Sequence, residues 1–286
     1  MAIFCLDVGG TKTRARLDGG KTVAGPAGAL SLGAKVTEDA IRRAWSEASD
    51  NGDPKTSKIV AGLAGISLQD ARNDLLERLS DFQSVTLVSD GYAALMAATL
   101  GNPGTLISIG TGVTGLSLGQ DGTTRSVSGW GFPAGDIGGG SWIGRTAFGE
   151  VLRHLDGIAP DPPCPQSLIE GVLALAGKSE EDIMTWNVSA TPGDFARLAP
   201  LILEAAHSNP FCRSLAQMAA TEITDLARSL GDANPHLSGG LAKSLLPFCQ
   251  EVGPDFDWHF REIDPLDGLQ KIAQGSAPKE QQHRRV

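Results

Sequence analysis

The chain has 286 residues, of which 41% are hydrophobic and 20% charged, and this composition is typical of a globular protein with one large domain or two medium ones. Its 24 Lys and Arg residues against 33 Asp and Glu residues give a formal net charge of −9, which argues against nucleic acid or an anionic membrane as the main partner. The start of the chain resembles neither a signal peptide nor a membrane span, and four widely spaced cysteines without a Cys-x-x-Cys pair favour a cytoplasmic protein with reduced thiols.

The first hundred residues predict strands that alternate with helices. The expected strands cover residues 3–8, 13–17, 21–24, 58–62, 84–89 and 105–109. An Asp18-Gly19-Gly20 hairpin turn joins the second strand to the third. Helices are expected over 37–49 and 91–100, and Ser67 with Asp70 has the spacing of a capping box that opens another. This alternation predicts an α/β fold.

After residue 145 the pattern becomes mostly helical. Thr191-Pro192-Gly193-Asp194 predicts a helix start, with Pro at the first position and an acid at the third. Asn209-Pro210 repeats this device before a long helix that ends at Gly231. The expected buried stripe of that helix consists of Leu215, Met218, Ala219, Ile223, Leu226 and Leu230.

The opening segment is similar to a later segment of the chain, which suggests an internal repeat. Residues 6–23 can be placed over residues 107–127, so that Gly9 falls on Gly110 and Thr13 on Thr114. Both segments read strand, Gly/Thr turn, strand, Asp-Gly turn, strand. A short match can arise by chance, but it predicts two related halves that each present a hairpin turn toward a common cleft.

The first glycine turn fits neither of two common phosphate-binding motifs, because a dinucleotide fingerprint and a P-loop both open a helix. The residues after Gly10 alternate as a strand instead. The turn would therefore offer an anion the N–H groups of a β-hairpin, the hydroxyls of Thr11 and Thr13, and the charge of Lys12. A plain hairpin turn is the alternative, and Lys12 is equally well explained as a solvated side chain.

Asp7 is an acid between two apolar strand residues, directly before the glycine turn. A buried carboxylate without a partner is costly, so its position indicates a nearby cation. Hydrated Mg²⁺ is one such cation. A polar strand end is the structural alternative.

Several short stretches resemble a known family. Residues 7–13, Asp-Val-Gly-Gly-Thr-Lys-Thr, resemble the first phosphate motif of the actin/hexokinase/Hsp70 nucleotide-binding superfamily. The further stretches are 61–65, 89–94, 109–112, 129–131 with 135–136, and 238–241. In this order they resemble the BadF/BadG/BcrA/BcrD-type ATPase family, specifically its N-acetylglucosamine kinase branch.

The resemblance implies an α/β fold with two actin-like (ribonuclease H-like) lobes and a central nucleotide and sugar cleft. The expected lobes are residues 1–104, completed by the segment 265–286, and residues 105–264 with a helical insertion. The implied activity is transfer of the γ-phosphoryl group of ATP, with Mg²⁺, to the 6-hydroxyl of N-acetylglucosamine. Related kinases are often dimers, so a homodimer is an open expectation.

The resemblance also assigns residues by position. Asp90 would be the general base and would touch the sugar. The other implied contacts are Gly9, Gly10, Thr11, Lys12, Thr13, Gly110, Thr111 and Gly112 with the ATP phosphates, Gly239 and Gly240 with adenosine, Gly129, Trp130 and Asp136 with sugar hydroxyls, and Asp7 with Mg²⁺ through water.

Two of these assignments have structural alternatives. Asp90 stands between a strand and a helix, where Asp commonly serves as an N-cap, although a carboxylate at the carboxyl end of a strand also faces the cleft of an α/β fold. The glycine-rich loop over 129–140 could be a mobile linker, but Trp130 and Asp136 within it favour sugar binding.

The sequence departs from the family pattern at two positions. Ile137 stands where family members usually carry Glu beside Asp136, and Leu32 stands where the eukaryotic enzymes carry Asn. Leu32 cannot form a side-chain hydrogen bond, so glucosamine or another hexose derivative is an alternative acceptor. An Fe–S-holding ATPase activator is disfavoured, because no Cys neighbours the motifs at 110 and 129. A non-catalytic nucleotide sensor remains a more distant alternative.

Overall fold

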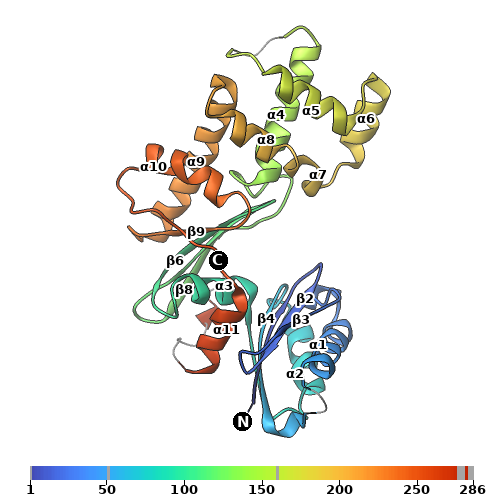
Figure 1. The fold of residues 1–286 in the computed structure, drawn as a ribbon, viewed down its shortest axis with the longest axis vertical. Helices are drawn as coiled ribbons and strands as arrows, with labels where there is room; N and C mark the ends of the chain where they lie inside the picture. The colour runs from blue at the N-terminus through green and yellow to red at the C-terminus, as the bar shows by residue number, and fades with distance from the viewer. Residues whose placement is uncertain (1, 50–51, 159–160, 276–280, 283–286) are drawn as a thin grey trace. The chain divides into compact units, whose positions relative to one another are not determined.

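The computed structural model describes residues 2–49, 52–158, 161–275 and 281–282 (Figure 1). The chain divides into two compact units. The first holds residues up to Gly104, the hairpin residues Leu118–Thr124 and the described residues from Ile263 on, and the second holds Thr105–Ser117 and Arg125–Glu262. The hairpin residues therefore group with the first unit, whereas the expected lobe 105–264 includes them. Residues 276–280 and 283–286 of the expected C-terminal completion lie outside the described residues.

The first unit is built on a mixed sheet with the strand order β3-β2-β1-β4-β5. Its strands are β1 (Ala2–Val8), β2 (Thr13–Leu17), β3 (Thr22–Gly25), β4 (Ser57–Leu63) and β5 (Ser84–Ser89). β1, β4 and β5 run parallel, while β2 and β3 continue the sheet antiparallel. Asp18 and Gly19 both have positive φ, 48° and 71°, as the turn between β2 and β3 requires.

Helices cover both faces of this sheet (Figure 1). The helical segments are η1 (Leu30–Leu32), α1 (Ala34–Ala48), η2 (Pro54–Thr56), α2 (Gln69–Arg78), α3 (Asp90–Ala98) and α11 (Pro265–Ala273). Alternate β1 residues such as Phe4 and Leu6 join the core cluster that includes Ile41 of α1, whereas Cys5 faces Gln270 of α11. Because alternate residues of a strand point to the same face, Asp7 lies on the same face of β1 as Cys5, toward α11.

The second sheet has the order β10-β9-β6-β7-β8-β11. Its strands are β6 (Gly104–Ile109), β7 (Val113–Leu118), β8 (Thr123–Ser128), β9 (His236–Ser238), β10 (His259–Phe260) and β11 (Gln281–Gln282). The helices that accompany it are α4 (Gly140–Leu155), α5 (Gln166–Ala176), α6 (Glu180–Ser189), α7 (Pro192–Ala196), α8 (Ala199–Ala205), α9 (Pro210–Leu230) and α10 (Ala242–Val252).

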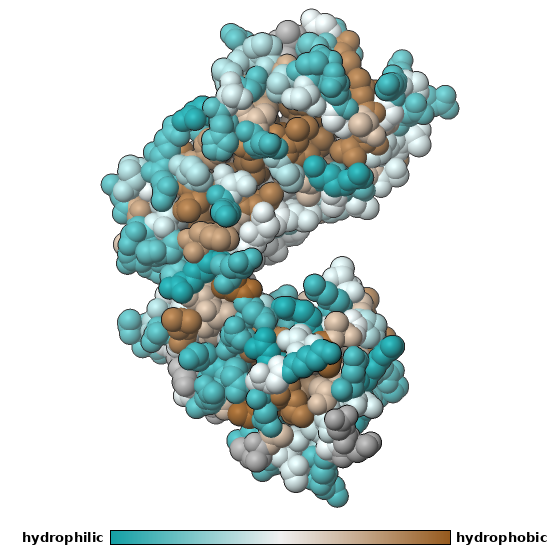
Figure 2. All heavy atoms as spheres, viewed as in Figure 1, coloured by the Kyte–Doolittle hydropathy of each residue, from teal (hydrophilic) through white to brown (hydrophobic). Residues whose placement is uncertain are grey.

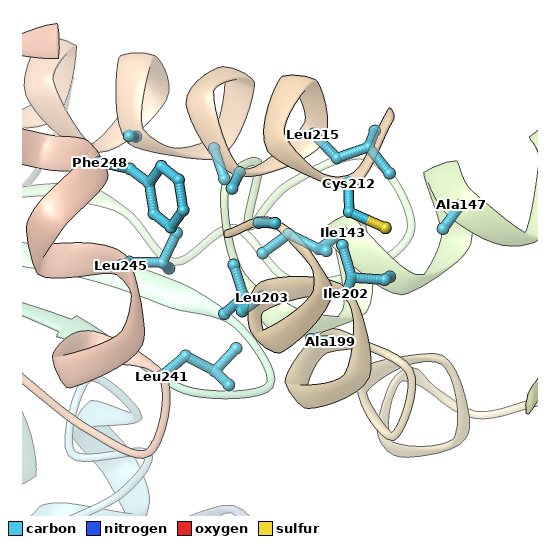
Figure 3. Packing of buried hydrophobic residues seen from close by; sticks show 14 of the residues in the cluster. Ile143, Ala147, Ala199, Ile202, Leu203, Cys212, Leu215, Leu241, Leu245 and Phe248 are labelled. Carbon is cyan, nitrogen blue, oxygen red and sulfur yellow. The ribbon is translucent and has the colours of Figure 1, made fainter. Parts of the chain in front are cut away.

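The core of the second unit lies between its helices. Figure 3 shows Ile143 of α4, Ile202 of α8, Cys212 of α9 and Phe248 of α10 meeting in one apolar cluster. On the face drawn in Figure 2, apolar residues also gather over the helical part of this unit, within a mostly hydrophilic surface. No helix in the described part of the chain combines the length and apolarity needed to cross a bilayer.

The internal repeat is present in the structure, but the alignment of its two segments differs by one residue from the predicted one. β1-β2-β3 and β6-β7-β8 each form strand, turn, strand, turn, strand. The N–H of Gly9 donates to the carbonyl of Lys12, three residues on, whereas that of Gly110 donates to Gly112, two residues on. The second turn is one residue shorter, so Thr13 corresponds to Val113, and the predicted match with Thr114 is wrong.

Candidate active site

The turn between β1 and β2 is held by its backbone. The N–H of Gly9 donates to the carbonyl of Lys12 at 3.0 Å, and the carbonyl of Gly9 accepts from the N–H of Ala29 at 3.1 Å. Gly10, Thr11 and Lys12 are exposed. Within the described residues the N–H groups of Gly10 and Thr11 have no partner, so the turn can donate to an anion.

Thr13 does not join these exposed groups. It is fully buried as the first residue of β2, and its Oγ1 lacks a hydrogen-bond partner in the described part of the chain. A side chain at Gly28 would lie 3.2 Å from that hydroxyl, which shows how closely this strand is packed. The Thr13 hydroxyl therefore differs from the exposed groups of the turn in its burial, and its contact with phosphate stays a prediction.

Asp7 forms an ion pair with an arginine of the neighbouring strand. Register places Asp7 opposite Arg14 of β2, and the Nη2 of Arg14 lies 2.8 Å from Oδ2 of Asp7. Oδ1 of Asp7 has no partner among the described residues. No cluster of three or more ligating side chains occurs in the described ranges, and Mg²⁺ commonly takes one or two carboxylates, water and substrate phosphates. A carboxylate with one free oxygen therefore fits Mg²⁺, although Asp7 does not need a metal to balance its charge.

Asp90 is the first residue of α3, directly after β5. The N-cap is Ser89, whose Oγ accepts from the N–H of Tyr92 at 3.0 Å, so the alternative role of Asp90 as N-cap is wrong. Oδ1 of Asp90 accepts from the N–H of Gly91 at 2.9 Å. Although Asp90 retains an exposed edge, desolvation raises the pKa of its carboxyl, the Gly91 N–H lowers it, and the negative charge of Asp7 raises it further.

The second unit has a recess of about 410 Å³ at the other glycine turn. The lining includes Gly110 and Gly112 from the turn between β6 and β7, Gly129 and Asp136 from the loop after β8, and Gly239 after β9. These residues come from three motifs that lie far apart in the sequence. The fold of this unit thus brings together groups that the resemblance assigns to phosphate, sugar and adenosine.

The turn at the recess is oriented by the start of α4. The carbonyls of Gly110 and Thr111 accept from the N–H groups of Gly140 and Ser141, each at 2.8 Å. Thr111 is exposed, and its hydroxyl and N–H, like the N–H of Gly112, have no partner in the described ranges. These donors and the recess together make a candidate anion site.

The loop after β8 contacts its own unit through Pro133 and Asp136, and it lies within the second unit and does not join the two units. Arg145 donates to the carbonyl of Pro133 at 2.8 Å and lies 5.5 Å from the centre of the Phe132 ring. The carboxylate of Asp136 packs directly on Gly112, where an added Cβ would lie 2.7 Å from its Cγ. Trp130 is 73% exposed and does not line the recess.

The two glycines after β9 separate two recesses. Gly239 lines the first one, whereas Gly240 lines a second recess of about 450 Å³ with Glu204, His207 and Lys243. The backbone of Gly239 has a φ of 100° and approaches Ile109 so closely that an added Cβ would lie 2.8 Å from its carbonyl carbon. Only glycine fits this position without strain.

Sequence reasoning missed Arg14 and its contact with Asp264, 3.2 Å away. The sequence does contain a pattern that predicts the pairing of Arg14 with Asp7. A hairpin with four turn residues after Val8 pairs Asp7 with Arg14, and this cross-strand pairing could have been inferred from the strand register.

Comparison with known proteins gives consistent matches. Residues 6–246 match the model of the BadF/BadG/BcrA/BcrD ATPase family. The glucosamine kinase GspK of Vibrio cholerae is 29% identical over 230 residues, which cover 76% of each chain. A crystal structure of a candidate N-acetylglucosamine kinase from Chromobacterium violaceum has a TM-score of 0.80 and 30% identity, covering 94% of this chain and 97% of that one.

A candidate N-acetylglucosamine kinase from Porphyromonas gingivalis shares the fold, with a TM-score of 0.72 at 19% identity and coverage of 96% and 99%. These likenesses confirm the expected α/β fold of the actin-like class.

Proposed function

Because the chain belongs to the BadF/BadG/BcrA/BcrD ATPase family, we propose that it is an ATP-dependent amino-sugar kinase that phosphorylates N-acetylglucosamine at the 6-hydroxyl. The observation that carries this proposal is the recess in the second unit, where the motifs at 110–112, 129–136 and 239 meet. The relatives named as kinases of glucosamine and N-acetylglucosamine support the substrate class.

In this proposal the two glycine turns bind the ATP phosphates. Gly10 and Thr11 of the first unit, and Thr111 and Gly112 of the second, offer N–H groups without partners among the described residues. Adenosine lies along Gly239 and Gly240. Asp7 would hold Mg²⁺ through water, and the bound ion would supply positive charge against the phosphates.

Asp90 orients the acceptor hydroxyl and takes its proton as the hydroxyl oxygen attacks the γ-phosphorus. The bond between that phosphorus and the β,γ-bridging oxygen breaks, and ADP leaves. Phosphoryl transfer needs mostly positioning and charge neutralisation. A single carboxylate aimed at the hydroxyl is therefore enough to accept its proton. Asp136 accepts hydrogen bonds from sugar hydroxyls. Its place against the anion-binding turn puts an acceptor for hydroxyls beside donors for phosphate within a single unit.

Glucosamine is the main alternative acceptor. Leu32 is 52% exposed at the end of η1, and Ile137 beside Asp136 is 41% exposed, so neither apolar side chain is committed to the core. Neither can hydrogen-bond to an N-acetyl group or support Asp136. The glucosamine kinase among the relatives favours the same alternative.

The test is sugar-dependent ADP release from the purified protein with MgATP. N-acetylglucosamine, glucosamine, N-acetylmannosamine, N-acetylmuramic acid and glucose are offered in parallel. Turnover with an amino sugar above glucose supports the proposal, and the preferred sugar decides between the two acceptors. Binding of ATP without ADP release on any sugar would favour the nucleotide sensor instead.

The pH dependence of the reaction provides an independent check on Asp90. A general base must be ionised, and the pKa of Asp90 is raised above the ordinary value of 3.8. We expect kcat/KM to decline on acidification with a midpoint above 3.8, because protonation begins at a higher pH than for an exposed Asp. The measurement is a pH profile of kcat/KM on the preferred sugar at saturating MgATP. A midpoint at or below 3.8 would contradict the raised pKa of the base.

A further inference from the structure

Strand β2 carries two arginines on one face, and both form ion pairs with the start of α11. Arg14 lies 3.2 Å from Oδ1 of Asp264, and Arg16 lies 2.7 Å from its Oδ2. Arg16 also pairs with Asp267 at 2.7 Å. Of the two arginines, Arg14 is the one that also reaches Asp7, at 2.8 Å.

Asp264 is itself held in place by the fold. As N-cap of α11, its Oδ1 accepts from the N–H of Leu266 at 3.2 Å. α11 packs closely on α3, where a side chain at Gly268 would lie 2.7 Å from the N of Ala97. Because α3 begins at Asp90, the same pair of helices supports Asp90 and, through Asp264, the guanidinium of Arg14.

Arg14 binds its partners through only part of its guanidinium. Its Nη2 contacts both Asp7 and Asp264, while its Nε is buried and lacks a hydrogen-bond partner within the described residues. A buried donor without an acceptor is unfavourable, so packing alone does not explain why the side chain lies there. The ion pairs with Asp7 and Asp264 account for its position.

We propose that Arg14 is a positioning residue that Asp264 holds in place and that fixes the carboxylate of Asp7 for MgATP. This inference rests on the proposed kinase function. The Arg14 contact occupies Oδ2 of Asp7 and leaves Oδ1 free, so it restricts rotation of the carboxylate without consuming both oxygens. Residues that orient a metal-binding side chain typically change metal affinity or activity by about 10–100-fold when removed.

The experiment compares Arg14→Gln with Arg16→Gln. Each variant removes an arginine with two carboxylate partners from the same strand face, but Arg16→Gln leaves the contact with Asp7 in place. Calorimetry without sugar measures the affinity for ATP in the presence and absence of Mg²⁺. Asp7→Asn provides the reference value for loss of the metal contact. Thermal unfolding reports stability, and sugar-dependent ADP release reports kcat and KM.

We expect Arg14→Gln to reduce the enhancement of ATP affinity by Mg²⁺ about tenfold, toward the Asp7→Asn value, and to lower kcat about tenfold with the sugar KM within about threefold. Arg16→Gln should leave the Mg²⁺ enhancement and kcat within about threefold of wild type, while the midpoint of thermal unfolding falls similarly in both variants. Arg14→Lys keeps the charge but replaces the planar guanidinium with a compact ammonium group, so it should be intermediate.

Equal effects of Arg14→Gln and Arg16→Gln would overturn the inference, because they would show a structural role. A larger Mg²⁺ enhancement in Arg14→Gln would also overturn it, since Arg14 would then compete with the metal. If Arg14→Gln does not fold, the pair Arg14→Lys and Arg16→Lys decides by the same criterion. A wild type that binds MgATP but turns over no sugar would refute the kinase function, while the binding measurements would still decide the role of Arg14.

Discussion

Replacing Asp90 with Asn is expected to lower kcat by about 10²–10⁴-fold, the usual cost of losing a general base, while ATP binding persists. The amide has the same shape, and its oxygen can still accept from the N–H of Gly91, which lies 2.9 Å from Oδ1 in the native protein. What the variant cannot do is take a proton. The measurement is kcat for ADP release on the preferred sugar, with ATP affinity determined separately by calorimetry.

Ser89→Ala is the matched control for a helix-capping effect. It removes the hydroxyl that accepts from Tyr92, which should lower stability by about 1 kcal/mol. Asp90→Asn keeps that cap, so its thermal unfolding should remain close to wild type. If Asp90→Asn retains kcat within about threefold of wild type, Asp90 is not the base.

Local features of the fold could be predicted from the sequence because their causes are local. Asp18-Gly19 takes the two positive φ values that its turn needs. Asn209 caps α9 by accepting from the N–H of Cys212 at 3.0 Å, and Thr191 forms a capping box with Asp194. In each case the residues that determine the structure are within a few positions of one another.

Other local patterns were misleading. The capping box expected at Ser67 and Asp70 is wrong, since α2 begins at Gln69 after Leu68, without a side-chain cap. Met218 of α9 is 47% exposed, although its spacing suggested burial. Four of the ten buried residues of α9 are alanines, so large side chains alone define its buried face poorly.

The candidate site depends on contacts that the sequence does not display. The motifs were recognised one by one, but their meeting in one recess required the fold. Thr13 is buried as the first residue of β2, although its place beside the glycine turn suggested a contact with phosphate. The contact between Arg14 and Asp264 joins residues about 250 positions apart, and no local pattern specifies such a pair.

The second large effect is expected for Gly112→Ala, which should lower kcat/KM for the sugar by roughly 100-fold. An added Cβ would overlap the carboxylate of Asp136 and displace it from the recess. The loss corresponds to about 3 kcal/mol, the upper range for hydrogen bonds to a charged group. The backbone of Gly112 does not require positive φ, and the obstructing atoms belong to a side chain that can move, so the fold should persist.

The double variant Gly112→Ala with Asp136→Ala separates two explanations of that loss. If the methyl group acts by displacing Asp136, the double variant should have the same kcat/KM as Asp136→Ala alone, because the displaced group is already absent. If the methyl group instead blocks phosphate at the turn, the double variant should be worse, with a raised KM for ATP. Measuring kcat/KM for both substrates in the four proteins of this cycle therefore tests whether Asp136 and the glycine turn act on different parts of the reaction, the sugar hydroxyls and the phosphates.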